Sequence, residues 1–157
     1  MNLFEALGQI ILALGGPFVT PPKIIPGLTL AGAYTSGDAF GTLFWFDVPR
    51  RGVVQGVIFH DRDNEKLAKE IILSPAEFTP TANDSAFAPS AFDLTRLFPI
   101  RIVVSNFDAY NANAIGHVEG VNLPYVAPEG KLWCQVVTRG ADNIASGSEP
   151  SISLIIK

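Results

Sequence analysis

The densest group of polar side chains, residues 61–65, follows an apolar run and has residue types that could bind a cation. Asp61, Asp63 and Glu65 supply carboxylates at alternating positions. A calcium loop uses oxygen ligands in this pattern, but it also needs a glycine for its sharp bend and a late bidentate carboxylate. This segment has no glycine, and Arg62 places a positive charge in its middle. The pattern favours a polar hairpin turn, with a cation near Asp61 and Asp63 left open.

The other reactive residue types do not combine into a motif. His60 and His117 are the only histidines, and a histidine metal site needs both of them or a carboxylate beside one. No serine lies in a Gly-x-Ser-x-Gly sequence, and Cys134 lies in an apolar run where a buried, unreactive thiol is expected. The glycines of residues 37–41 lie between expected strands, which does not favour a phosphate site. The sequence therefore predicts no catalytic residue, no metal and no cofactor.

The charge and hydrophobic content of the chain argue against some classes of binding partner. The chain has 157 residues, a net charge of −4, 48% hydrophobic residues and 17% charged residues, the last well below the roughly 25% of average soluble domains. No basic stretch is longer than Arg50–Arg51, which argues against nucleic acid and against an acidic membrane surface. The low charge favours either a large core or a surface covered by other chains.

The first 27 residues differ from the rest of the chain. Asn2 and Glu5 have the spacing of a capping box, and the apolar residues that follow recur every three or four positions, as in a helix. Gly15-Gly16-Pro17 should end this helix. It lacks the positive start and the cleavage site of a signal peptide, and about a dozen residues cannot span a bilayer, which needs roughly twenty.

The prolines of residues 17–26 predict an extended arm that is held away from the body. A short helix of this kind has only marginal stability when isolated in water, so its apolar side chains should be buried against another surface. One alternative is that the helix folds back onto its own domain. We expect instead that it docks on a neighbouring chain through Leu3, Phe4, Leu7, Ile10, Ile11, Leu14, Phe18 and Val19.

From residue 28 onward the chain shows short apolar runs separated by Gly, Pro, Asn and Asp, the pattern of an all-β domain. A long loop is expected at 77–89, followed by a short helix capped by Ser90. A weak strand at 106–114 is expected to pair with 116–123. The other expected strands are 28–35, 42–48, 53–60, 70–74, 100–105, 131–138 and 151–156. The predicted fold is mainly β, an antiparallel β-sandwich or jelly-roll-like domain over 28–157, preceded by the helix and arm of 1–27.

Several turns of this body resemble those of small structural proteins of tailed bacteriophages. Those proteins open with Ala-Tyr-x-Ser-Gly-Asp-x-x-Gly, which is similar to residues 33–41, and they carry a strand ending in an Asp-x-Asp turn, which is similar to 57–63. A Pro-Thr-x-x-Asp-Asn-Ala-x-Phe segment resembles residues 80–87, a Val-x-Arg-Gly strand resembles 136–140, and a final Leu-rich strand resembles 153–156. The first 27 residues have no counterpart in this pattern.

The resemblance implies a capsid decoration (cement) protein, which is a virion component on the capsid surface, made in the host cytoplasm. It implies a homotrimer that contacts the major capsid protein and neighbouring copies of itself and catalyses no reaction. Three alternatives remain. One is a tail, neck or head-fibre component of the virion. Another is a carbohydrate-binding module in which Tyr110, Tyr125 or Trp133 forms a platform for sugars. The third is an enzyme.

Overall fold

The computed structural model describes residues 3–157. The predicted N-terminal helix is confirmed as α1 (Leu3–Ala13), and it ends before the two glycines. The capping box falls outside the described part of the chain, because Asn2 and the side chain of Glu5 are not among the described groups.

The larger of two sheets has six strands, all antiparallel to their neighbours. Its order is β1-β10-β4-β8-β7, and β2 also pairs with β10. The strands are β1 (Phe18–Val19), β2 (Lys23–Ile24), β4 (Arg51–Asp61), β7 (Phe107–Tyr110), β8 (Asn113–Val126) and β10 (Ser151–Ile156).

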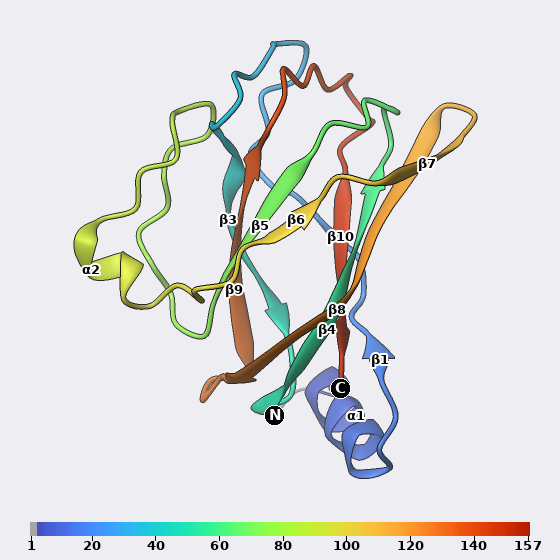
Figure 1. Ribbon diagram of the computed structural model, residues 1–157, viewed down its shortest axis with the longest axis vertical. Coiled ribbons are helices and arrows are strands. Elements are labelled where there is room, and N and C mark those ends of the chain that lie inside the picture. The colour runs from blue at the N-terminus through green and yellow to red at the C-terminus, as the bar shows by residue number, and fades with distance from the viewer. Residues whose placement is uncertain (1–2) are drawn as a thin grey trace.

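The smaller sheet has four strands in the order β3-β9-β5-β6, again antiparallel. The strands are β3 (Ala39–Asp47), β5 (Lys69–Ser74), β6 (Ile102–Val104) and β9 (Lys131–Thr138). Between β5 and β6 the chain leaves the sheet in a long excursion that carries the short helix α2 (Ala91–Leu94) (Figure 1).

The two sheets pack face to face around one core, as the predicted β-sandwich requires. Alternation along each strand produces this core. In β4, for example, Val57 and Phe59 are buried, while Ile58 between them is only partly covered. From the smaller sheet, Phe40 and Phe46 of β3 meet them.

Most of the predicted elements are confirmed, and the limits of two strands, 131–138 and 151–156, are those of β9 and β10. The 106–123 pairing is present as β7 and β8, and Ser90 caps α2 through its hydroxyl. One strand prediction is wrong. Residues 28–35 form an irregular loop, in which Tyr34 turns inward and its hydroxyl binds backbone and side-chain groups.

The expectation that the prolines hold the arm away from the body is also wrong. β1 and β2 pair with β10 at the edge of the larger sheet, and Phe18 and Ile25 belong to the core. The prolines permit this arrangement because an edge strand does not need every backbone N–H. α1 therefore lies against the end of its own sandwich, beside the C-terminus (Figure 1).

The opposite end of the sandwich is closed by loops. Residues 28–38 and 139–150 come together there, far from α1, and the β7–β8 hairpin projects to one side (Figure 1). Within residues 3–157 no helix combines the length and the apolar character needed to cross a bilayer.

Candidate functional site

One face of α1 packs onto the sandwich. The ring of Phe4 meets that of Phe18 edge-on, with centroids 5.8 Å apart, and Ile11 packs against the core. Gly8 lies between them, and a Cβ atom there would be 2.9 Å from both Phe18 Cζ and Pro49 Cγ. The helix approaches this closely because Gly8 has no side chain. We call Phe4, Gly8 and Ile11 the inner face of α1.

A second face of α1 is apolar and exposed. Leu3, Leu7, Ile10 and Leu14 have 88%, 50%, 58% and 82% of their surface accessible. Their spacing of four, three and four residues is that of a coiled-coil seam, which places the side chains in one narrow stripe. We call these four residues the outer face of α1. The helix therefore buries its inner face and leaves these four large apolar side chains exposed to solvent.

The structure thus divides the eight residues that were predicted to bind a partner. Four of them form the outer face, and Val19, in the edge strand β1, is 50% exposed. The other three, Phe4, Ile11 and Phe18, turn toward their own sandwich. The sequence contained one signal for this division, because Gly8 lies one turn from both Phe4 and Ile11 and marks the side of close approach.

At the loop end, Asn83 is the centre of a hydrogen-bonded cluster. Its Oδ1 accepts the hydroxyl of Tyr34 at 2.8 Å and the backbone N–H of Gly41 at 2.7 Å. Its Nδ2 donates to Thr29 Oγ1 at 2.8 Å, and Tyr34 Oη accepts the Thr29 N–H at 2.7 Å. One amide side chain therefore joins both ends of the turn that carries Tyr34.

The same turn bonds to two further segments. The N–H of Gly37 donates to the carbonyl of Thr138 at 2.8 Å, and the N–H of Thr138 donates to the carbonyl of Asp38 at 3.0 Å. Asp38 forms a β-bridge with Ala86, and the N–H of Phe87 donates to the carbonyl of Gly37 at 2.9 Å. We call residues 29–41, 81–87 and 138 the loop cluster.

The loop cluster brings together three of the segments that carry the resemblance to phage structural proteins, namely 33–41, 80–87 and 136–140. These segments are distant in sequence. Backbone hydrogen bonds join Gly37 to Thr138 and to Phe87, and the side chain of Asn83 bonds to Tyr34 and Gly41, so these bonds fix the shape of the loops.

The carboxylates of the 61–65 turn bind backbone groups. Asp61 accepts the N–H of Asp63 at 3.1 Å and of Lys66 at 2.6 Å, and Asp63 accepts the N–H of Ala145 at 2.7 Å. Residues 62 and 63 form a polar turn, but the predicted hairpin is wrong, because β4 lies in the larger sheet and β5 in the smaller one, and the two strands do not pair. Among the residues described, no three His, Cys, Asp or Glu side chains are grouped so that they could hold a metal ion.

The remaining reactive groups are separated. His60 Nδ1 lies 3.2 Å from Ser151 Oγ, and burial lowers the pKa of His60. His117 lies on the exposed face of β8. Cys134 is fully buried in β9, where burial raises the pKa of its thiol and disfavours the reactive thiolate.

The three aromatic residues considered for sugar binding do not form a shared platform. Tyr110 is exposed near the tip of the β7–β8 hairpin, whereas Tyr125 and Trp133 are buried. The hydroxyl of Tyr125 is buried with no hydrogen-bond partner among the described residues, and burial raises the pKa of Tyr125. Only Tyr110 could contact a sugar as the chain stands.

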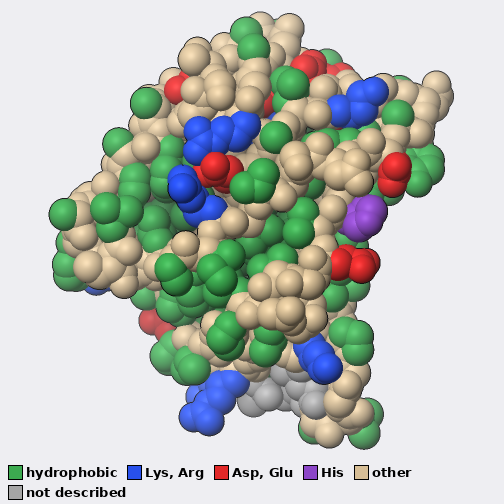
Figure 2. Space-filling view, viewed as in Figure 1, with side chains coloured by type: hydrophobic (Ala, Val, Ile, Leu, Met, Phe, Trp, Pro, Cys, Tyr) green, Lys and Arg blue, Asp and Glu red, His purple; other side chains and the backbone are tan. Residues whose placement is uncertain are grey.

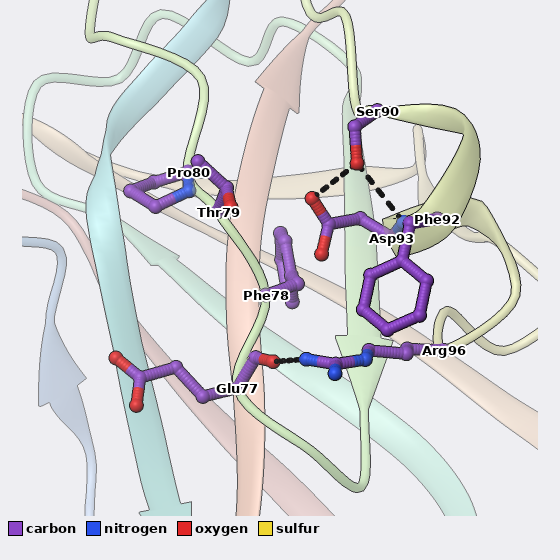
Figure 3. Close-up of a pocket in the computed structure, with 8 residues that line it drawn as sticks. All are labelled: Glu77, Phe78, Thr79, Pro80, Ser90, Phe92, Asp93 and Arg96. Carbon is purple, nitrogen blue, oxygen red and sulfur yellow. Dashed lines mark hydrogen bonds between the residues drawn. The ribbon is translucent and has the colours of Figure 1, made fainter.

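A surface hollow of about 490 Å³ lies between α2 and the 77–80 segment (Figure 3). Arg96 reaches across it and donates to the carbonyl of Glu77 at 2.8 Å, and its guanidinium lies 4.3 Å from the centroid of the exposed Phe92 ring. Ser90 donates to Asp93 at 2.6 Å, and this bond lowers the pKa of Asp93. Arg96 thus joins the segment after α2 to Glu77, and the Ser90–Asp93 bond stabilises the start of α2.

The viewed face of the molecule is notably apolar. Figure 2 shows hydrophobic side chains gathered across its middle, with one compact group of Lys and Arg around an acidic side chain. Exposed large apolar residues also occur away from α1. They include Trp45, Phe92, Leu94, Ile100 and Val103.

Comparison with known proteins found no matching protein family, no matching curated protein and no matching solved structure.

Proposed function

We propose that this chain is a structural protein of a bacteriophage virion, a capsid decoration (cement) subunit that acts as a homotrimer. It binds the major capsid protein and neighbouring copies of itself on the capsid surface and stabilises the shell by adhesion. The outer face of α1 is its principal contact surface.

The observation that carries this proposal is the exposed stripe of Leu3, Leu7, Ile10 and Leu14. Soluble monomers rarely leave several large aliphatic side chains side by side in water, and such patches mark interaction sites. Burying these four side chains would contribute about 5 kcal/mol before the cost of association is subtracted. The seam-like spacing suits a partner helix or an apolar groove.

The resemblance to phage structural proteins is the second argument for the proposal. Segments 33–41, 80–87 and 136–140, which resemble phage structural proteins, form one bonded unit here. A resemblance limited to solvated turns could arise from turn chemistry alone. Residues that bond across long sequence separations specify a particular loop arrangement, so the likeness carries more weight.

The mechanism is multivalent attachment. In a trimer, three copies of the outer face of α1 are presented at once. After the first contact forms, the others face a high effective concentration of their target, so several weak contacts combine into firm attachment. Low charge suits this role, because a surface that repeatedly meets identical neighbours avoids like-charge repulsion.

The test compares wild-type protein with the double variant Leu7→Asp/Ile10→Asp. Its readouts are mass in solution by light scattering and co-sedimentation with capsids of the same virus that lack this protein. We expect a trimer that co-sediments for wild type, and at least a tenfold loss of capsid binding for the variant, because charges on the outer face oppose its burial.

The matched control is Leu94→Asp, which places a charge on an exposed leucine of α2 and should leave binding unchanged. Point variants are preferred to deletion of residues 1–26, because Phe18 and Ile25 belong to the core. The proposal would be overturned if the wild-type protein stays monomeric and does not co-sediment with capsids. Binding to tails or necks and not to capsids would overturn the capsid location and identify the protein as a tail or neck component of the virion.

A further inference from the structure

A lysine and an aspartate are buried together between the two sheets. Lys69 Nζ lies 2.7 Å from Asp142 Oδ1, and the two side chains have only 3% and 1% of their surface accessible. Lys69 begins β5, and Asp142 lies in the loop between β9 and β10, 73 residues further along the chain. Burial of both members of an ion pair removes a large hydration energy from each, so this pair calls for an explanation.

The surroundings of the amine are aromatic. Lys69 Nζ lies 5.1 Å from the centroid of the Phe40 ring and 5.5 Å from that of Phe59, one from each sheet. Its other hydrogen-bond partner is the carbonyl of Leu67 at 2.7 Å. Burial lowers the pKa of Lys69, which favours the neutral amine, the form that acts as a nucleophile.

The carboxyl group of Asp142 is held at both oxygens. Oδ1 receives the Lys69 bond, and Oδ2 accepts a short hydrogen bond from the hydroxyl of Thr138. Nearby, burial, followed by the charge of Asp142, raises the pKa of Glu65. An amine in contact with a fixed carboxyl group in a water-poor site is arranged for condensation.

We propose that Lys69 and Asp142 form an intramolecular amide bond. Lys69 first transfers a proton to Asp142 Oδ1 along their hydrogen bond, which leaves a neutral amine and a neutral carboxyl group. The amine lone pair then attacks Cγ, and Thr138 donates to Oδ2 as negative charge develops there. The Cγ–Oδ1 bond breaks, Oδ1 takes a second proton from the nitrogen, and one water molecule leaves. No oxidant, metal or further reactant is needed.

The bond would tie the start of β5 to the β9–β10 loop, beside the loop cluster, because the N–H of Tyr34 donates to the carbonyl of Asp142 at 2.9 Å. A covalent link that closes a loop of this length restricts the unfolded chain and stabilises the fold. The inference is independent of the proposed function, and either could fail alone.

The test is the intact mass of the purified wild-type chain, measured after denaturation. We expect a mass lower than that of the linear sequence by one water molecule. Proteolysis should release a branched peptide that joins the segment containing Lys69 to the one containing Asp142. The full linear mass would overturn the proposal. So would a deficit that maps to a linear peptide, since an aspartate can also lose water to its own backbone.

Two variants and a control complete the test. Lys69→Met, which keeps the length of the side chain without the amine, and Asp142→Ala should each have the full mass. Both should also lose the more compact mobility of the linked chain in denaturing gels. Lys131→Met removes a lysine that lies over Trp45, 4.8 Å from the ring centroid, and should keep the deficit. A deficit that survives in Lys69→Met would also overturn the proposal.

Discussion

The two ends of this sandwich differ in the kind of side chain they present and in how those side chains are covered. At the loop end, buried or partly buried polar groups are paired with one another, as Asn83 shows by bonding Tyr34, Gly41 and Thr29. At the helix end, the outer face of α1 leaves apolar side chains uncovered. One end pairs its polar groups within the chain, and the other exposes a row of large apolar side chains.

The difference separates residues that specify the fold from residues that are free to bind. A polar group buried without a partner costs roughly 1–3 kcal/mol, so the loop cluster has few alternative arrangements. An exposed leucine imposes no such geometric demand, and its burial by another chain is favourable. Substitutions at the loop end should therefore unfold the protein, whereas substitutions on the outer face should affect association.

The largest expected effect is at Gly41, in the loop cluster. Gly41 has φ +82°, and a Cβ atom there would lie 2.6 Å from the carbonyl oxygen of Pro26 and 2.5 Å from Ile25 Cγ2. Gly41→Ala should reduce the free energy of unfolding by roughly 3 kcal/mol or more, because a backbone atom has to move as well as a side chain. Urea denaturation followed by tryptophan fluorescence measures the loss.

Gly120→Ala provides the matched control. Gly120 has φ +72°, but no atom lies within 4 Å of the place that a Cβ atom would take, so only the backbone conformation is penalised. We expect a loss of about 1–2 kcal/mol. Equal losses at the two glycines would show that Gly41 is not tightly packed against residues 25 and 26, which would weaken the contrast between the two ends.

A moderate effect should separate the two faces of α1. Phe4→Ala removes the ring that packs edge-on against Phe18, and about 2 kcal/mol of unfolding free energy should be lost. Leu7→Ala, on the outer face, should change it by less than about 0.5 kcal/mol. Both are measured by urea denaturation at a protein concentration low enough to keep the chain monomeric. A larger loss for Leu7→Ala would mean that the outer face is already covered.

Much of the fold could be predicted because strand patterning is local. β9 and β10 consist of apolar runs bounded by turn residues, and their predicted limits match the structure. The prediction of a strand at 28–35 was wrong because it also rested on local pattern alone, and the apolar residues of this segment have the pattern of a strand. Its conformation is set by Asn83, about fifty residues away, and no local pattern carries that information.

The position of the arm could not be predicted either. Prolines restrict the backbone to extended geometry, which fits a free arm and an edge strand equally well. The pairing with β10 decides between them, and it depends on the opposite end of the chain. The stripe on α1 was visible as apolar periodicity, and Gly8 was the one local signal of the inner face, but the packing of Phe4 and Ile11 on the core shows which side chains are covered.

The smallest expected effect concerns His60, at the loop end of β4 and bonded to Ser151. Burial lowers the pKa of His60 in the folded chain below its value of about 6.5 in the unfolded chain. Between the two pKa values the unfolded state binds more protons, so the free energy of unfolding should rise with pH up to about 6.5.

His60→Gln should flatten this rise in urea midpoints measured from about pH 5 to about pH 8. His117→Gln, on the exposed face of β8, is the control for loss of an imidazole from the same sheet. A profile that stays equally steep in His60→Gln would show that His60 does not govern this pH dependence.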